Sequence, residues 1–155
     1  MGDRTYVTLR VLEAQADEAE ALFGGYGNDS KELFDGLVEF GFPDVNYGNL
    51  DFLSDLIDAG IAYNSHWDNG SEYGPGTEYG RYKPNGEAVT VSVYEAQANP
   101  PMDRLLENID NHELLRKVIL DHHAACTVLP LDADQIKYGR KHRTLQLITP
   151  AECIE

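Results

Sequence analysis

Two short segments bring histidine and carboxylate side chains together, and the first of them is His66 with Asp68. These residues are separated by one position, and a glycine-rich stretch with Glu72 and Tyr73 follows them. A histidine beside a carboxylate can act as a general base or acid. No serine or cysteine, however, stands in a recognisable nucleophile motif such as Gly-x-Ser-x-Gly. An enzyme that uses His66 is therefore kept as an alternative, and no catalytic residue is predicted.

The second segment is Asp121-His122-His123, near the end of a predicted helix over about 111–125. His112 and His123 fall on roughly the same face of that helix. Eleven residues correspond to about 16 Å of rise, which is too far for one metal ion. His122 continues an apolar stripe and is interpreted as a packed histidine. An enzyme that uses His122 and His123 is the other form of the catalytic alternative.

Motifs for metals and nucleotides are weak. Asp44–Gly48 loosely resembles the start of a calcium-binding loop, but the glycine and the final glutamate of that loop are replaced by Asn49 and Asp55. The cysteines and histidines lack the spacing of a zinc site. The chain also has no Gly-x-Gly-x-x-Gly or P-loop sequence. We predict neither a metal nor a cofactor.

The dominant feature of the sequence is an acidic, aromatic-rich stretch from Glu32 to Gly80. Its 49 residues contain ten acids, nine aromatic residues and no Lys or Arg. The whole chain has a net charge of −15, and residues 1–80, with 16 acids and 3 bases, carry −13 of it. A hydrophobic content of 42% argues against disorder. This half of the chain is therefore expected to fold and to project a negative field.

This charge distribution restricts the possible partners. A surface that binds nucleic acid needs Lys and Arg for the phosphates, so direct binding of nucleic acid is not expected. An anionic membrane surface would repel the protein. The predicted partner is a positively charged protein surface, in the sharpest case the groove of a nucleic-acid-binding protein. The candidate partner-binding residues are Glu39, Asp44, Asp51, Asp55, Asp58, Asp68, Glu72, Glu78, Tyr47 and Tyr73.

Three of these acids fall on one face of a predicted helix over about 50–59. At about 100° per residue, Asp51, Asp55 and Asp58 lie close together, opposite an apolar side. No Lys or Arg stands three or four residues away to offset their repulsion. The bland interpretation is an ordinary solvated helix face. The functional interpretation is a row of carboxylates that imitates phosphates.

The sequence therefore predicts an acidic, non-enzymatic binding protein. Its sharpest form is a DNA mimic, an inhibitor or decoy of the type that phages and mobile elements use against host defence. A generic protein–protein interaction module, in which the acidity only sets association rate and solubility, is the main alternative. The small enzyme described above is the second alternative.

Hydrophobic periodicity and turn residues predict a single α+β domain over residues 1–155. Strands are expected at 5–12, 37–42, 61–67, 77–83, 88–94 and 143–149, and helices at 14–23, 50–59, 102–109 and 111–125. Residues 26–36 and 126–141 are predicted to be mostly loop. This order, β-α-β-α-β-β-β-α-α-β, favours a largely antiparallel sheet covered by helices. A hinge is possible near 97–101, before the last helices and strand.

The compartment is inferred from what the N-terminal residues and the cysteines suggest. The first ten residues lack an apolar signal core. No run approaches the roughly 20 apolar residues of a membrane helix. We expect a cytoplasmic protein in which Cys126 and Cys153 are reduced thiols.

Overall fold

The computed structural model describes residues 3–148 of the chain. The strands are β1 (Arg4–Leu12), β2 (Ser30–Phe34), β3 (Leu37–Asn46), β4 (Tyr63–Trp67), β5 (Gly76–Tyr82) and β6 (Ala88–Tyr94). The helices are η1 (Glu13–Gln15), α1 (Ala16–Phe23), α2 (Leu53–Asp58), α3 (Glu95–Ala98), α4 (Met102–Glu107), α5 (His112–Cys126) and α6 (Ala133–Ile148). The predicted α+β single-domain class is confirmed.

The six strands form one sheet in the order β2-β3-β1-β4-β5-β6, with every neighbouring pair antiparallel. Strand β1 lies inside the sheet, and its alternating sequence sends Val7, Leu9 and Val11 to one face, where all three are fully buried. Thr8 and Arg10 point to the opposite face. The alternation that predicted the strand therefore also separates a core face from an open face.

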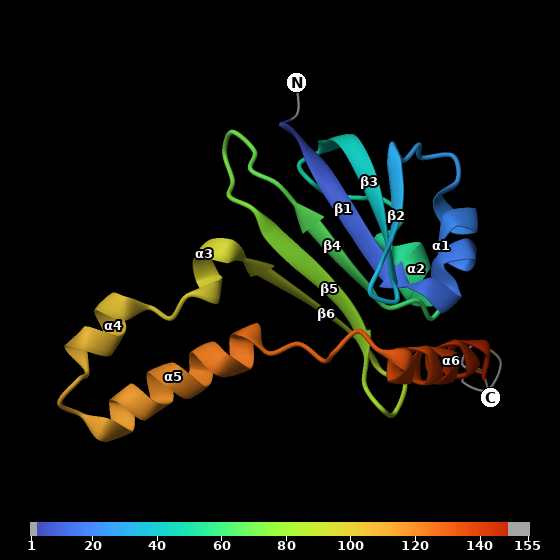
Figure 1. Cartoon of the computed structure of the whole chain (residues 1–155). Helices are drawn as coiled ribbons and strands as arrows, with labels where there is room; N and C mark the ends of the chain where they lie inside the picture. The colour runs from blue at the N-terminus through green and yellow to red at the C-terminus, as the bar shows by residue number, and fades with distance from the viewer. Residues whose placement is uncertain (1–2, 149–155) are drawn as a thin grey trace, which may run out of the picture.

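Helices α1 and α2 cover the core face of the sheet (Figure 1). Phe23 of α1 packs against Phe40, Phe42 and Phe52, with ring centroids 4.8–5.3 Å apart. Leu56 of α2 is fully buried beneath this layer. Burying such aromatic side chains supplies much of the energy of a small core, because each ring removes a large apolar area from water.

Residues 127–132 form no helix or strand, as predicted for this part of the loop over 126–141. Helix α6 replaces the rest of that loop and the strand predicted for 143–149, so both predictions were wrong from residue 133 to residue 148. Gln135, which is buried, donates to the carbonyl oxygen of Tyr82 and accepts from its backbone N–H. Gly139 lies so close to Gly60 that an added Cβ would stand 2.1 Å from the Gly60 oxygen. The apolar residues near 145–148 resembled a strand, but in the structure the helix is held by a glutamine and a glycine.

Two smaller differences concern the first half of the chain. Residues 30–34 were predicted as loop but form β2, an edge strand that pairs with β3. Its apolar side chains are exposed, Leu33 at 65%, so they give no buried alternation to detect. Helix α2 begins at Leu53, so Asp51 lies in the preceding turn and not on the helix.

Residues 95–126 form an arm, consisting of α3, α4 and α5, that projects beyond the β6 edge of the sheet (Figure 1). In this segment Val118 is the one residue that is buried. The predicted hinge near 97–101 falls between α3 and α4. Within residues 3–148, no helix is both long and apolar enough to cross a membrane.

Candidate functional site

The ten predicted partner-binding residues do not share one surface. Asp51, Asp55 and Asp58 lie on the helical side of the molecule. Asp44, Tyr47, Asp68, Glu72 and Tyr73 lie near the end of the sheet where β1 begins and where β3 and β4 end. Glu39 and Glu78 lie elsewhere on the sheet.

The helical side carries more acid than the sequence analysis assigned to it, because α1 and α2 pack side by side. We call the acids of these helices and their flanking turns the acidic helical layer: Glu13, Asp17, Glu18, Glu20, Asp51, Asp55 and Asp58. Within residues 3–148, two cations form ion pairs with this layer. Lys31 contacts Glu20 at 2.6 Å, and Arg143 contacts Glu18 at 3.2 Å.

Helix α6 brings basic residues next to this layer, which the sequence did not reveal. Gln146 of α6 donates to Asp58 at 3.4 Å, and Arg143 reaches α1. Lys141 instead donates to the carbonyl oxygen of Pro84. Among the described residues, Asp51 and Asp55 make no ion pair. The acidic helical layer is therefore bordered by a basic helix along one side but is not neutralised by it.

The second group of acids surrounds the N-terminal end of β1. The Asp3 carboxylate accepts the backbone N–H groups of Ser71 and Glu72, at 2.6 and 3.2 Å. Arg4 donates to the carbonyl oxygen of Asp44 at 2.9 Å. Asp3 and Arg4 therefore connect loops to one another through hydrogen bonds. This end of the sheet is therefore built by local structural contacts, although its outer acids remain exposed.

The last two predicted residues point away from both groups. Glu39 is on the open face and pairs with Arg10 at 2.5 Å. Glu78 is on the core side of β5, next to Tyr63. Burial raises the pKa of Glu78, and a hydrogen bond from Tyr63 opposes part of that rise. We leave both residues out of the proposed binding surface.

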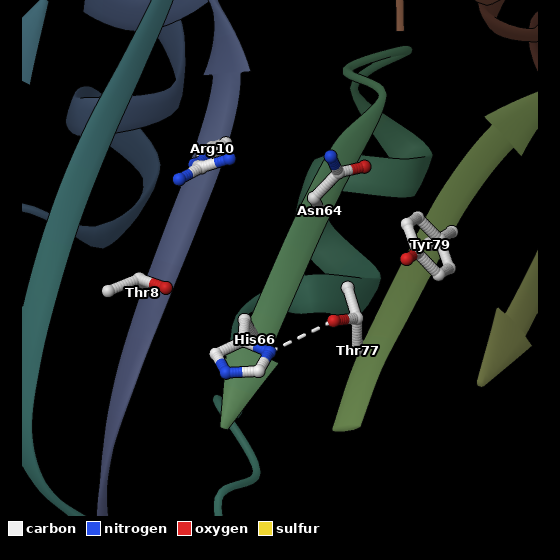
Figure 2. Close-up of a pocket in the computed structure, with 6 residues that line it drawn as sticks. All are labelled: Thr8, Arg10, Asn64, His66, Thr77 and Tyr79. Carbon is white, nitrogen blue, oxygen red and sulfur yellow. Dashed lines mark hydrogen bonds between the residues drawn. The ribbon is translucent and has the colours of Figure 1, made fainter. Parts of the chain in front are cut away.

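The open face of the sheet contains a polar groove with a volume of about 300 Å³. Figure 2 shows its lining residues, which come from three adjacent strands: Thr8, Arg10, Asn64, His66, Thr77 and Tyr79. Arg81, on the same strand as Thr77 and Tyr79, donates to the side-chain oxygen of Asn64 and to the backbone carbonyl oxygen of Tyr63. Burial lowers the pKa of Arg81 to about 10. Four donated hydrogen bonds fix this guanidinium in place.

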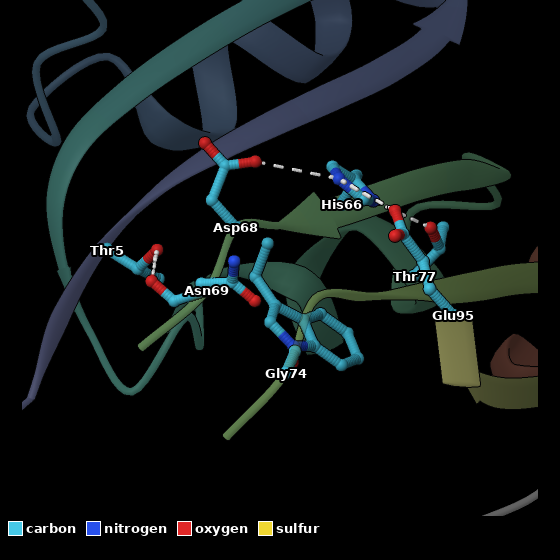
Figure 3. Close-up of polar contacts among 8 residues, drawn as sticks. Thr5, His66, Asp68, Asn69, Gly74, Thr77 and Glu95 are labelled. Atoms are coloured by element: carbon cyan, nitrogen blue, oxygen red, sulfur yellow. Dashed lines mark hydrogen bonds and ion pairs between the residues drawn. The ribbon is translucent and has the colours of Figure 1, made fainter. Parts of the chain in front are cut away.

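His66 links the groove to the base of the arm (Figure 3). Its Nδ1 lies 3.0 Å from the Thr77 hydroxyl, and its Nε2 lies 3.6 Å from Asp68 and 3.8 Å from Glu95. The sequence analysis found Asp68 but missed Thr77 and Glu95. Thr77 stands directly across from His66 in the β4–β5 pairing, so an assumed hairpin register would have revealed it. No group of three metal-binding side chains occurs within residues 3–148.

The other candidate histidines lie in the arm. His122 is half-buried on α5, with its Nε2 3.9 Å from Cys126 Sγ, and His123 is exposed. Cys126 is a free thiol, and Cys153 falls outside the described residues. The structure therefore does not join these histidines to His66.

Comparisons with known protein families, with curated proteins and with solved structures found no match. The functional reasoning accordingly rests on the geometry of this chain.

Proposed function

We propose that this protein is a non-enzymatic binding protein whose acidic helical layer docks on a positively charged protein surface. The observation that carries the proposal is the side-by-side packing of α1 and α2. It gathers seven acids from two separate parts of the chain, with two paired bases among them. The basic groove of a nucleic-acid-binding protein is the partner class that fits such a surface best, and the protein would act on it as a decoy.

The helix dipole favours Asp17, Glu18 and Asp55, which lie in the first turns of α1 and α2, but it gives no reason for Asp58 at the end of α2. Exposed like charges one turn apart on a helix destabilise it by a few tenths of a kcal/mol per pair. Asp55 and Asp58 are exposed, stand three residues apart and have no described cationic partner. A cationic partner would turn this repulsion into attraction and would accelerate association. The rigid helices would also spare part of the ordering entropy that a flexible acidic tail loses on binding.

The groove on the open face supports an enzyme less well. Among the described residues, the His66 ring makes one hydrogen bond, to Thr77, whereas Asp68 and Glu95 stand beyond hydrogen-bonding distance of the ring. A polar open face is the ordinary state of an antiparallel sheet that has helices on one side. For these reasons the groove is not the proposed working site.

The test compares two matched triple variants. The first, Asp51→Asn with Asp55→Asn and Asp58→Asn, removes three charges from the acidic helical layer. The control removes three exposed charges from the arm through Asp103→Asn, Glu107→Gln and Asp110→Asn. Each protein is immobilised and used to capture partners from host lysate, and association with the captured protein is then measured at low and high salt.

The layer variant should associate about tenfold more slowly and show a weaker salt dependence, because rim charges act mainly on association rate. The control should associate like the parent protein. If both variants weakened association equally, the acidity would act only as a general contribution to solubility. Capture of a partner without any basic surface would overturn the proposal directly.

A further inference from the structure

Another cavity, with a volume of about 490 Å³, lies against the hairpin formed by β5 and β6. Its walls include Val89 and Val91 of β6, Val128 and Leu129 of the segment that joins α5 to α6, and Arg81 and Lys83 of the hairpin. A cavity of several hundred Å³ that combines apolar walls with a few polar groups is the usual form of a small-molecule site. This cavity therefore has the size and the lining of a ligand site.

The cavity forms because the open face of the sheet becomes apolar at β6. Val89 pairs with Arg81 and Val91 pairs with Tyr79, so the two valines share the open face with those side chains. The segment after α5 passes over this part of the sheet, where the carbonyl oxygen of Leu129 accepts a hydrogen bond from Arg81 Nε at 2.7 Å. Residues 127–129 therefore enclose the space above the valines.

Arg81 is a buried cation, and within residues 3–148 no carboxylate pairs with it. The residue is 5% exposed, and Asp132 attracts it only from beyond ion-pair distance. Its four hydrogen bonds all end on uncharged oxygens, namely the carbonyl oxygens of Tyr63, Gly80 and Leu129 and the side-chain oxygen of Asn64. Arginine is almost never buried this deeply without an anionic partner, because a charge removed from water is costly unless it is paired.

The surroundings of Arg81 indicate what kind of anion is missing. Its four hydrogen bonds do not use every N–H of the guanidinium, so a donor remains for a ligand. Lys83 adds a second positive charge at the cavity, although Glu87 pairs with it at 3.1 Å. The valines and Leu129 beside these cations offer only apolar contacts. A ligand that fits this environment has one anionic group and an apolar body.

We propose that this cavity binds a small amphipathic carboxylate, with its anionic group next to Arg81 and its apolar body between the valines of β6 and Leu129. Such a ligand would supply the anion that the buried cation lacks, through a charge-assisted hydrogen bond. It would also cover the apolar walls, which are otherwise in contact with water. The cavity lies on the opposite face of the sheet from α1 and α2, so the inference is independent of the proposed function (Figure 1).

The experiment titrates the purified full chain with decanoate by isothermal titration calorimetry at about pH 7, where the carboxylate is ionised. The parent should bind about one decanoate per chain, with a Kd below about 100 μM. Decanol, which has the same apolar body without the charge, should bind at least about tenfold more weakly. Decyl phosphate is the third probe, and tighter binding of this probe than of decanoate would overturn the assignment of a carboxylate.

Two variants test the position of the ligand. Val91→Trp fills the cavity without changing any charge and should weaken decanoate binding at least about tenfold. Arg81→Gln should remove the preference for decanoate over decanol, because it removes the cation. Circular dichroism checks the fold of both variants, and Val91→Trp decides alone if Arg81→Gln does not fold.

The control combines Leu106→Asp with Ile119→Asp in the arm, where these side chains are 58% and 49% exposed and offer decanoate a different apolar surface. This variant should bind decanoate like the parent. The proposal is overturned if the parent does not bind decanoate, if Val91→Trp binds it like the parent, or if a folded Arg81→Gln keeps the preference. It is also overturned if the arm control loses as much binding as Val91→Trp.

Discussion

The body and the arm of this protein use similar amphipathic helices with opposite results. In the body, α1 and α2 bury Phe23 and Leu56 against the sheet until almost nothing of them is exposed. In the arm, α5 has an equally regular apolar stripe, but Leu114 and Ile119 remain about half exposed. In both regions the local sequence shows the same pattern, with apolar residues repeated at helical spacing. The difference shows that a helical pattern predicts the need for a partner but not where the partner comes from.

The largest expected contrast between the two regions is in stability. Leu9→Ala in the sheet should lower the free energy of unfolding by about 2–5 kcal/mol, because it leaves a cavity in a closed core. Leu106→Ala in the arm should change that free energy by less than about 0.5 kcal/mol, as surface substitutions do. Urea unfolding of the two variants measures both. A similar loss in the two variants would mean that the arm is packed into the body.

The next expected effect concerns the hydrogen bonds that attach α6 to strand β5. Gln135→Ala would leave the buried backbone N–H and carbonyl of Tyr82 without partners, and we expect a loss of about 3 kcal/mol of stability. Gln146→Ala, on the exposed side of the same helix, should cost less than about 0.5 kcal/mol. Thermal or urea unfolding of both variants gives the comparison. Equal losses of stability in both variants would show that the hydrogen bonds between Gln135 and Tyr82 do not attach the helix to the sheet.

The pH dependence of stability should depend on Glu78, the acid that the body half-buries. Burial raises its pKa in the folded protein, so the folded state holds the proton more tightly than the unfolded state. The stability contributed by that proton is full below the unfolded-state pKa and is lost as pH rises through the folded-state pKa. Glu78→Gln should therefore be more stable than the parent at about pH 7, and the difference should shrink toward about pH 4. Urea titrations at both pH values measure it, and a pH-independent difference would contradict the assignment.

The smallest expected effect concerns His66, which lies on the open face of the sheet near Glu95, the first residue of the arm. His66→Ala should leave binding to a captured partner within about tenfold, or about 1.4 kcal/mol, because the ring lies on the open face, away from the acidic helical layer. His122→Ala and His123→Ala should behave alike. Titration calorimetry with the captured partner measures all three. A folded histidine variant without activity would favour the enzyme alternative.

Periodicity predicted the elements whose apolar residues repeat regularly on one face, even where that face is not buried. Strand β6 and helix α5 were placed within one or two residues because Val89, Val91 and Val93, or Leu114 and Val118, repeat regularly. Strand β2 was missed because an edge strand exposes its apolar side chains. Helix α6 was misassigned because the relation between apolarity and burial is inverted in it: Gln135 and Gly139 are buried, whereas Leu147 is 85% exposed.

The candidate surface was predictable only in part for a related reason. Asp55 and Asp58 could be placed on one helix from their spacing alone. The contribution of Asp17 and Glu18 could not, because it depends on two helices meeting across more than 30 residues of chain. The pairing of Arg143 with Glu18 depends on a contact 125 residues apart. Proximity of this kind is a property of tertiary packing and leaves no trace in local spacing.

The contact between Gln135 and Tyr82 also has a consequence for the order of events during synthesis. These residues are separated by 53 positions, and all six strands have been translated before α6 emerges. Domains generally fold as units while they are synthesised. Until residues 133–148 leave the ribosome, the backbone N–H and carbonyl oxygen of Tyr82 lack their hydrogen bonds to Gln135, and Gly60 lacks its contact with Gly139. The contact that fastens α6 to the sheet can therefore form only after all six strands have been translated.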